Sequence, residues 1–311
     1  MAKILVTGAA GYLGSTLCQH LLEKGHQVMA LDNLMYGQHS LFQYCANPNF
    51  DFTFGDARDE ATMKSLIKKA DVIIPLAAIV GATACDRDPW RANEINLGSI
   101  QLVNKLRSMQ QLVVLPNTNS GYGTKSGESY CTEESPLEPI TLYGRTKVDA
   151  EKEMLNSQNA ICLRLATVFG MSPRMRLDLL VNHFTYAAFT DGYICIFEKD
   201  FKRNYVHVRD VADCMCHCIE HPAGMVGKPF NVGLDAANLS KEELALRVKE
   251  YLPKFYIHFS ELGSDPDKRN YIVSNKRLAD AGFTAKRTID DGIKELIKGY
   301  RMLGRQALKN V

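Results

Sequence analysis

Apolar and polar residues follow a regular pattern along the first half of the chain. Short apolar runs are separated by stretches with amphipathic helical spacing, and the runs lie near Ile4, Val28, Phe52, Val72, Val113 and Cys162. Strands that alternate with helices are typical of a parallel sheet covered by helices on both faces. The pattern therefore predicts an α/β fold with a doubly wound parallel sheet.

The second half of the chain has a looser pattern. From Ser172 onward the predicted helices and strands are shorter, and prolines separate them at Pro173, Pro222, Pro229, Pro253 and Pro266. Residues 203–211 have the pattern of a strand that turns into a helix, and residues 289–303 that of an amphipathic helix. We predict a large domain over 1–170, interleaved with about 203–221, and a smaller α/β lobe over 171–311.

A glycine-spaced loop, TGAAGYLG, lies directly between the first apolar run and the first helical stretch. Gly8 suits a tight turn, Gly11 lets the backbone approach a pyrophosphate, and Gly14 lets helix and strand pack closely. The N-terminus of the following helix favours phosphate charge. The loop therefore predicts a dinucleotide site, with cofactor-binding candidates Gly8, Gly11, Tyr12, Leu13 and Gly14.

An acidic residue follows at the distance that such a site requires. The strand predicted over 27–31 ends in Asp32, whose carboxylate can accept hydrogen bonds from both adenosine ribose hydroxyls. A 2′-phosphate would meet this carboxylate, and Asn33, Leu34 and Met35 after it supply no arginine. NAD is therefore favoured over NADP, with Asp32 and Asn33 as contacts.

Two more strand ends carry small or acidic residues. Doubly wound sheets bind ligands at the carboxyl ends of their strands, and small residues there let a cofactor lie close. Ordinary turn packing explains the alanines equally well when they are taken alone. These further cofactor candidates are Asp56, Ala57, Leu76, Ala77 and Ala78.

Tyr143 and Lys147 stand four residues apart in a helical stretch, so both side chains lie on one face. A lysine cation beside a phenol favours the phenolate, which lowers the tyrosine pKa from about 10. Tyr143 can then act as a base toward a sugar or alcohol hydroxyl. A surface helix that happens to hold both residues is the alternative, but the glycine loop and Asp32 favour catalysis.

Polar residues gather after the strand predicted over 111–115. Thr118 can share the substrate proton with Tyr143 and steady charge that develops on oxygen, while Asn119 and Ser120 can orient the substrate. A polar loop built from turn residues is the alternative interpretation.

Composition excludes several other classes of protein. Of the 311 residues 46% are hydrophobic, and the formal net charge of +2 comes from dispersed side chains, which does not favour a nucleic-acid or membrane surface. No apolar run reaches the ~20 residues of a membrane span, and no export signal precedes the first strand. We therefore expect a cytoplasmic protein.

The nine cysteines include no C-x-x-C pair, which is typical of reduced, packed thiols. Cysteines and histidines cluster in the helix predicted over 208–220 and at the residue after it, and such a cluster could suggest a metal site. Cys214 and Cys218 share one helix face and Cys216 does not, so we interpret the cluster as helix core and predict no metal. The cluster is Cys214, Cys216, His217, Cys218 and His221.

These motifs together resemble the extended short-chain dehydrogenase/reductase family of NAD-dependent epimerases and dehydratases, over nearly the whole chain. The motifs are TGAAGYLG, Asp32, Asp56, LAA, Asn96, Tyr143 with Lys147, and RNYVHVRDVA. The resemblance implies a Rossmann-type domain, tightly held NAD, and commonly a homodimer through two helices, here about 89–109 and 141–156. It also implies that Tyr143 is the base and that Lys147 contacts the nicotinamide ribose. By the same resemblance Thr118 is the catalytic Ser/Thr, and Asn96 is the structural and cofactor-side asparagine.

The residues after Thr118 differ from those of two branches of the family. Dehydratases resemble Thr-Asp-Glu and decarboxylases resemble Thr-Ser-Glu at the site where this chain has Thr118, Asn119 and Ser120. The acid and base that eliminate water are therefore absent, and Ser120 stands where the decarboxylases have glutamate. Hydride chemistry alone remains.

Further polar residues match family positions that hold a nucleotide diphosphate or could line the sugar or nucleotide pocket. Arginine suits such a role because its planar fork meets phosphate oxygens bidentately, although a solvated surface arginine is the alternative for each. The candidates are Asn182, Arg203 and Arg269 for the diphosphate, and Arg174 and Arg176 for the pocket. Four segments most closely resemble the GDP-heptose 4-dehydrogenases of capsular heptose biosynthesis, and they are NTNSGYG (117–123), RLATVFG with SPRMRLDLLVN (164–182), RNYVHVRDVA (203–212) and DPDKRNY with the VS after it (265–274).

We therefore expect NAD-dependent oxidation of the C4 hydroxyl of a nucleotide-diphosphate sugar to a 4-keto sugar, with a GDP-linked heptose favoured. If the keto sugar leaves, the enzyme is a dehydrogenase. If it rotates and is reduced again, the enzyme is a 4-epimerase of a UDP- or GDP-sugar. A non-catalytic NAD-binding scaffold or sensor on the same fold is the alternative of another class, and Tyr143, Lys147 and Thr118 argue against it.

Overall fold

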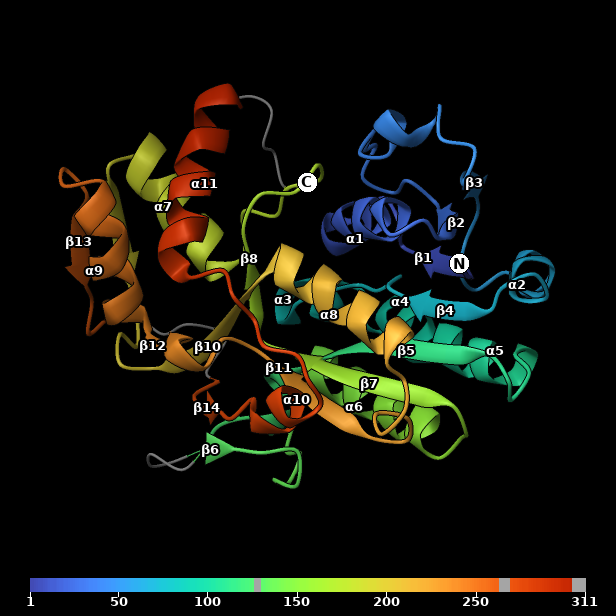
Figure 1. The fold of residues 1–311 in the computed structure, drawn as a ribbon. Coiled ribbons are helices and arrows are strands. Elements are labelled where there is room, and N and C mark those ends of the chain that lie inside the picture. The colour runs from blue at the N-terminus through green and yellow to red at the C-terminus, as the bar shows by residue number, and fades with distance from the viewer. Residues whose placement is uncertain (126–129, 263–268, 304–311) are drawn as a thin grey trace.

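The computed structural model describes residues 1–125, 130–262 and 269–303, and a seven-stranded sheet lies at its centre (Figure 1). The strand order is β11-β7-β5-β4-β1-β2-β3, and every pairing is parallel. This confirms the predicted doubly wound α/β fold. The strands are β1 (Lys3–Thr7), β2 (Gln27–Asp32), β3 (Phe50–Phe54), β4 (Val72–Pro75), β5 (Leu112–Thr118), β7 (Ala160–Leu165) and β11 (Pro229–Val232).

Alternate residues of these strands face two separate apolar cores, because neighbouring side chains of a strand point to opposite faces. Ile4 and Val6 pack into one core with α1 and α8, while Leu5 packs into the other with α2, α5 and α6. Figure 1 shows α8 on one side of the sheet and α5 and α6 on the other. The helices are α1 (Tyr12–Glu23), α2 (Glu60–Ile67), α5 (Ser99–Leu106), α6 (Leu142–Leu155) and α8 (Val208–Glu220).

The cysteines of α8 belong to this packing. Cys214, Cys216 and Cys218 are all buried in the core between α1, α8 and the sheet. Among the described residues, no group of three or more His, Cys, Asp or Glu side chains is placed to hold a metal ion. No helix in the described part of the chain is long and apolar enough to cross a membrane.

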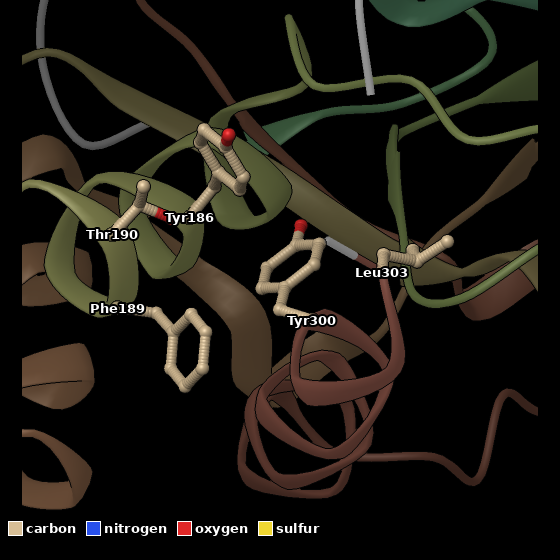
Figure 2. A pocket seen from close by; sticks show the side chains of 5 residues that line it. All are labelled: Tyr186, Phe189, Thr190, Tyr300 and Leu303. Carbon is tan, nitrogen blue, oxygen red and sulfur yellow. The ribbon is translucent and has the colours of Figure 1, made fainter. Parts of the chain in front are cut away.

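The second lobe is built on its own apolar core around Phe169, Phe184, Leu244 and Leu296. A small pocket opens between α7 and α11, lined by the side chains in Figure 2, none of which is a predicted site residue. The helices after residue 170, apart from α8, are α7 (Leu180–Thr190), α9 (Lys241–Tyr251), α10 (Lys276–Asp280) and α11 (Ile289–Met302). The small sheets are β12-β10-β8 (Asn238–Ser240, Lys202–His207, Thr167–Phe169), β13-β9 (Tyr256–Phe259, Tyr193–Ile196) and β14-β6 (Ile272–Val273, Tyr130–Cys131).

The chain returns once from the smaller lobe to the large sheet, as predicted, but over a longer stretch than 203–221. The strand and helix predicted over 203–211 are present as β10 and the start of α8, and α8 packs on α1. After α8, β11 pairs with β7 and becomes the outermost strand of the large sheet. The interleaved stretch therefore extends past residue 221 to Val232.

The helix expected over 89–109 is interrupted. It consists of α4 (Pro89–Asn93), a π-helical turn (Glu94–Gly98) and α5, and α3 (Ala82–Arg87) precedes it. α5 and α6 lie side by side, and Asn104 Nδ2 donates a hydrogen bond to Glu153 Oε1 at 2.6 Å. The homodimer expected through these helices stays a prediction.

Candidate active site

The glycine loop forms the tight turn between β1 and α1. Gly8 has φ +67°, and a Cβ on it would lie 2.7 Å from the Ala77 nitrogen. A Cβ on Gly14 would lie 2.4 Å from the Gly8 oxygen, so α1 can approach the turn only with glycine there. At Gly11 the nearest atom to such a Cβ is the Gly8 oxygen at 3.1 Å, and the other directions are open. This geometry suits the three tasks expected of the loop.

The N-terminus of α1 is available to an anion. Its first residue follows Gly11, no side chain caps the helix, and its first turn contains no acid. Backbone N–H groups at such an end attract phosphate. Asp32, at the end of β2, holds the neighbouring backbone because Oδ2 accepts from Ala10 N at 2.9 Å and Oδ1 from Leu34 N at 2.8 Å. The loop, the free helix end and the carboxylate fit a dinucleotide such as NAD.

The end of β3 meets the end of β2 through polar contacts. Asp56 pairs with Arg58, whose Nη2 lies 2.8 Å from Oδ2, and Asn33 also bonds to the carboxylate. These partners lower the pKa of Asp56 to about 2. Ala57 is buried next to them. The predicted residues Asn33, Asp56 and Ala57 are therefore brought together beside Asp32.

The segment after β4 is held by Asn96. Asn96 Oδ1 accepts from Ile79 N and Nδ2 donates to Ile79 O, each at 2.9 Å, and Nδ2 also lies 3.3 Å from Thr146 Oγ1. Ala77 N donates to Thr7 Oγ1 at 3.2 Å. These bonds fix Leu76, Ala77 and Ala78 over the glycine turn, which is the structural part of the role expected for Asn96.

A chain of hydrogen bonds connects the predicted catalytic residues. Tyr143 bonds to Thr118, Thr118 Oγ1 lies 2.8 Å from Ser120 Oγ, and Arg269 Nη1 donates to Ser120 Oγ. Thr118 is the last residue of β5, and Ser120 lies in the 3₁₀ turn after it, η3 (Asn119–Tyr122). The structure thus joins Tyr143, Thr118, Ser120 and Arg269, which come from three distant parts of the sequence.

Lys147 lies one turn after Tyr143 on α6 and is 5% exposed. Its Nζ donates to the Pro116 carbonyl at 2.7 Å. Burial lowers the pKa of Lys147 to about 8, while the negative charge of Glu151 acts in the opposite direction. Lys147 is therefore anchored to β5, next to the strand end that carries Thr118.

The electrostatic setting of Tyr143 differs from the sequence-based expectation. Burial raises the pKa of Tyr143, and the charges that act to lower it are those of Arg176 and Arg269, together with the hydrogen bond from Thr118. Lys147 donates instead to a backbone carbonyl. The pKa of Tyr143 is therefore raised and not lowered as the sequence predicted, because burial outweighs the charges around the phenol and Lys147 Nζ is directed at β5.

Sequence reasoning missed a buried ion pair behind Lys147. Glu151 and Arg164 are 2% and 4% exposed, and Arg164 Nη2 lies 2.7 Å from Glu151 Oε1. Glu151 Oε2 also accepts from Asn117 Nδ2 at 2.6 Å. Tyr143, Lys147 and Glu151 follow one another at four-residue intervals, so the helical spacing carried a signal for this third member. The pair fixes α6 to β5 and β7.

Asn119 is placed for a polar contact that the protein itself does not supply. It is 1% exposed, and neither side-chain amide atom has a hydrogen-bond partner among the described residues. A buried amide without a partner costs free energy, which a bound polar group would recover. The role of Asn119 toward substrate stays a prediction.

The diphosphate candidates lie in two environments. Arg203 on β10 is 1% exposed, and its Cζ lies 5.5 Å from the Tyr271 ring centroid. Asn182 on α7 is fully buried, and its amide bonds to Gly170 N and Arg176 O. Asn182 thus positions a backbone segment, and its direct contact with substrate stays a prediction. Part of the DPDKRNY motif, residues 265–268, lies outside the described residues.

Arg174 and Arg176 separate, although only one residue lies between them. The Arg174 Cζ lies 4.3 Å from the Tyr36 ring centroid, and the charge of Arg174 acts on Asp32. Arg176 pairs with Asp178, with Nε donating to Oδ1 at 3.1 Å, and its charge acts on Tyr143. Arg176 therefore lies near the catalytic residues, whereas Arg174 lies near the predicted adenosine site.

Together the fold and this site define an NAD-dependent enzyme of the extended short-chain dehydrogenase/reductase type. The chain belongs to the NAD dependent epimerase/dehydratase family, whose model matches residues 4–233. NAD is accordingly its cofactor, and its contacts with the glycine loop and Asp32 stay a prediction. This confirms the family that the sequence motifs indicated.

Comparison with individual proteins agrees with this assignment. The chain is 31% identical to a UDP-glucose 4-epimerase of Mycolicibacterium smegmatis over 96% of this chain and 98% of that protein. It is 30% identical to an uncharacterised UDP-glucose epimerase of Bacillus subtilis, over 83% and 85% of the two chains. The UDP-glucuronic acid 4-epimerase of Bacillus cereus, solved with UDP-glucuronic acid and NAD, has the same fold, with a TM-score of 0.86 at 23% identity over 97% and 99% of the chains.

The lowered pKa of Lys147 has a measurable consequence for stability. Between pH 8 and the ordinary value of 10.5, the unfolded chain binds more protons at this residue than the folded chain does. The contribution of Lys147 to the free energy of unfolding therefore rises with pH across this window. Denaturant unfolding of cofactor-free wild type and Lys147→Met at pH 8 and pH 10 should show their difference moving by about 2–3 kcal/mol in favour of wild type. A difference that stays constant would contradict the lowered pKa.

Proposed function

We propose that this protein is a nucleotide-sugar 4-epimerase, which oxidises the C4 hydroxyl of its substrate with NAD and reduces the resulting 4-keto sugar on the opposite face. The observation that carries the proposal is the Tyr143, Thr118 and Lys147 arrangement at the carboxyl edge of the sheet, next to the glycine loop. Two of the relatives named above are described as UDP-glucose epimerases, which supports re-reduction and a UDP-linked substrate.

The chain's own residues have distinct tasks in this reaction. Tyr143 takes the C4 hydroxyl proton and returns it, and Thr118 hydrogen-bonds to the same oxygen. Arg176 and Arg269 stabilise the phenolate form of Tyr143, since their charges lower its pKa. NAD, when bound, supplies the hydride acceptor. Asn119 and Ser120 orient the sugar, and Arg203 and Arg269 meet the diphosphate.

The absence of a carboxylate next to Thr118 keeps the reaction at hydride transfer. The two residues after Thr118 are Asn119 and Ser120, and neither supplies the acid needed to eliminate water. The GDP-heptose 4-dehydrogenase that the sequence favoured differs from this epimerase in two ways. Its substrate carries GDP in place of UDP, and it releases the keto sugar. The named relatives support the epimerase over that dehydrogenase.

Substrates labelled with deuterium at C4 distinguish these reactions. Purified enzyme is incubated separately with UDP-glucose, UDP-glucuronic acid and GDP-heptose, and the products are examined by NMR and mass spectrometry. An epimerase returns the label to C4 of the inverted sugar, and it accumulates no NADH. A released, unlabelled 4-keto sugar with labelled NADH would establish the dehydrogenase instead. Tight NAD binding with no C4 chemistry on any of them would favour a non-catalytic scaffold.

A further inference from the structure

One segment of the smaller lobe reaches across the cofactor-binding loop. It consists of residues 170–179, between β8 and α7, and we call it the β8–α7 segment. Tyr12 Oη donates to the Gly170 carbonyl oxygen at 2.7 Å, and Ser172 Oγ donates to the backbone carbonyl oxygen of Tyr12 at 2.6 Å. Ser172 Oγ also lies 3.1 Å from Ser15 Oγ. The segment is thus fastened to the first turn of α1, where the pyrophosphate is expected.

Beyond this point the segment reaches Asp32. Arg174 lies with its Cζ 4.3 Å from the Tyr36 ring centroid. Tyr36 belongs to the loop after β2, in which Gln38 Nε2 lies 3.5 Å from Asp32 Oδ1. The charge of Arg174 acts to lower the pKa of Asp32, against the burial that raises it. Arg174 and Tyr36 therefore lie beside the carboxylate that is expected to bind the adenosine ribose.

The other end of the segment faces the catalytic residues. The Arg176 guanidinium exerts its charge on Tyr143, and the Arg176 carbonyl accepts a hydrogen bond from Asn182 Nδ2 at 2.9 Å. Asn182 Oδ1 accepts from Gly170 N at 3.0 Å, so one buried amide fixes both the start and the middle of the segment. The segment consequently spans the adenosine side, the pyrophosphate side and the catalytic side of one site.

We propose that Arg174 is a cofactor-binding residue, which contacts the adenosine half of NAD opposite Asp32, and that the β8–α7 segment closes over the dinucleotide along its length. Arg174 and Tyr36 form the adenosine end of this closure, and Ser172 its pyrophosphate end. The sequence had placed Arg174 in the substrate pocket. The inference rests on the NAD site and is independent of the epimerase reaction, because any NAD-dependent chemistry would require the same retention.

Retention of the cofactor tests the role of Arg174 directly. Arg174→Gln is compared with wild type and with Arg247→Gln, which removes a half-exposed arginine on α9 that pairs with Glu250 and Asp290. NADH dissociation is followed by fluorescence, and the NAD content of the purified proteins by mass spectrometry. Loss of a charged contact predicts at least ~10-fold faster NADH release in Arg174→Gln alone, with unchanged affinity for UDP. Unchanged NADH release with weaker UDP binding would overturn the proposal and return Arg174 to the substrate.

A second test compares NADPH binding by two other variants, so it does not depend on the stability of Arg174→Gln alone. Asp32→Ala removes the carboxylate that repels a 2′-phosphate, while Arg174 remains beside that position. NADPH binding, measured by fluorescence titration, should therefore tighten at least ~10-fold in Asp32→Ala, and Asp32→Ala/Arg174→Gln should lose this gain. If both variants bind NADPH equally well, Arg174 does not face the adenosine ribose and the proposal fails. The measurement uses no sugar substrate, so it is separate from any failure of the epimerase proposal.

Discussion

Turnover should fall at least ~100-fold in Tyr143→Phe, with NAD still bound, because the variant loses only the hydroxyl that takes the substrate proton. The phenol bonds to Thr118, and two arginine charges act on it. Phenylalanine preserves the ring and its packing against the residues around Ile79 and Ala92. The loss should therefore appear in kcat and leave the NAD content unchanged, which mass spectrometry of the purified protein measures.

Tyr256→Phe is the matched control for this change. Tyr256 is 64% exposed on β13, and its hydroxyl can be removed without touching the site. Near-normal turnover in Tyr143→Phe would remove this tyrosine from the mechanism. Equal losses in both variants would show that the effect is not specific to the site.

Glu151→Ala should lower the free energy of unfolding by about 3–5 kcal/mol, because it leaves the buried Arg164 guanidinium without its charge partner. Arg164 Nε lies 3.1 Å from both carboxylate oxygens, and the same carboxylate accepts from Asn117. Urea unfolding followed by circular dichroism gives the free energy. The variant should also lose turnover, since Asn117 directly precedes Thr118 and Lys147 lies one helical turn away.

Two further variants separate the charge from the volume of the side chain. Glu153→Ala removes a carboxylate two residues along the same helix, whose bond to Asn104 is half-exposed, and should cost far less. Glu151→Ala/Arg164→Met removes both charges and should be more stable than Glu151→Ala alone. If Glu151→Ala costs no more than Glu153→Ala, the pair does not hold α6 against the sheet.

The fold and the cofactor edge could be predicted because their signals are local. The loop TGAAGYLG and Asp32 each follow directly from an apolar strand, and a parallel sheet brings such strand ends to one edge. Tyr143 and Lys147 were found by helical spacing, which the structure bears out on α6. The break in the helix over 89–109 was not predicted, because nothing in its apolar spacing marks the π-helical turn.

The long-range parts of the site could not be predicted in the same way. No arginine follows Asp32 directly in the sequence, whereas Arg174 comes from the other lobe and lies close enough for its charge to act on Asp32. The pKa of Tyr143 depends on its burial and on Arg176 and Arg269, which only the folded chain brings together. The choice of NAD survives this correction, because the family shows it and the carboxylate remains.

The outermost strand of the large sheet limits how the enzyme can be divided. β11 consists of residues 229–232, and α8 packs on α1. A fragment that stops at residue 170 would expose the backbone edge of β7, with buried residues such as Ile161 and Leu163. Exposed apolar edges pair with other chains, so this cofactor-binding half would aggregate when expressed by itself. Loss of a C-terminal part of the gene would thus yield an insoluble product and no free NAD-binding module.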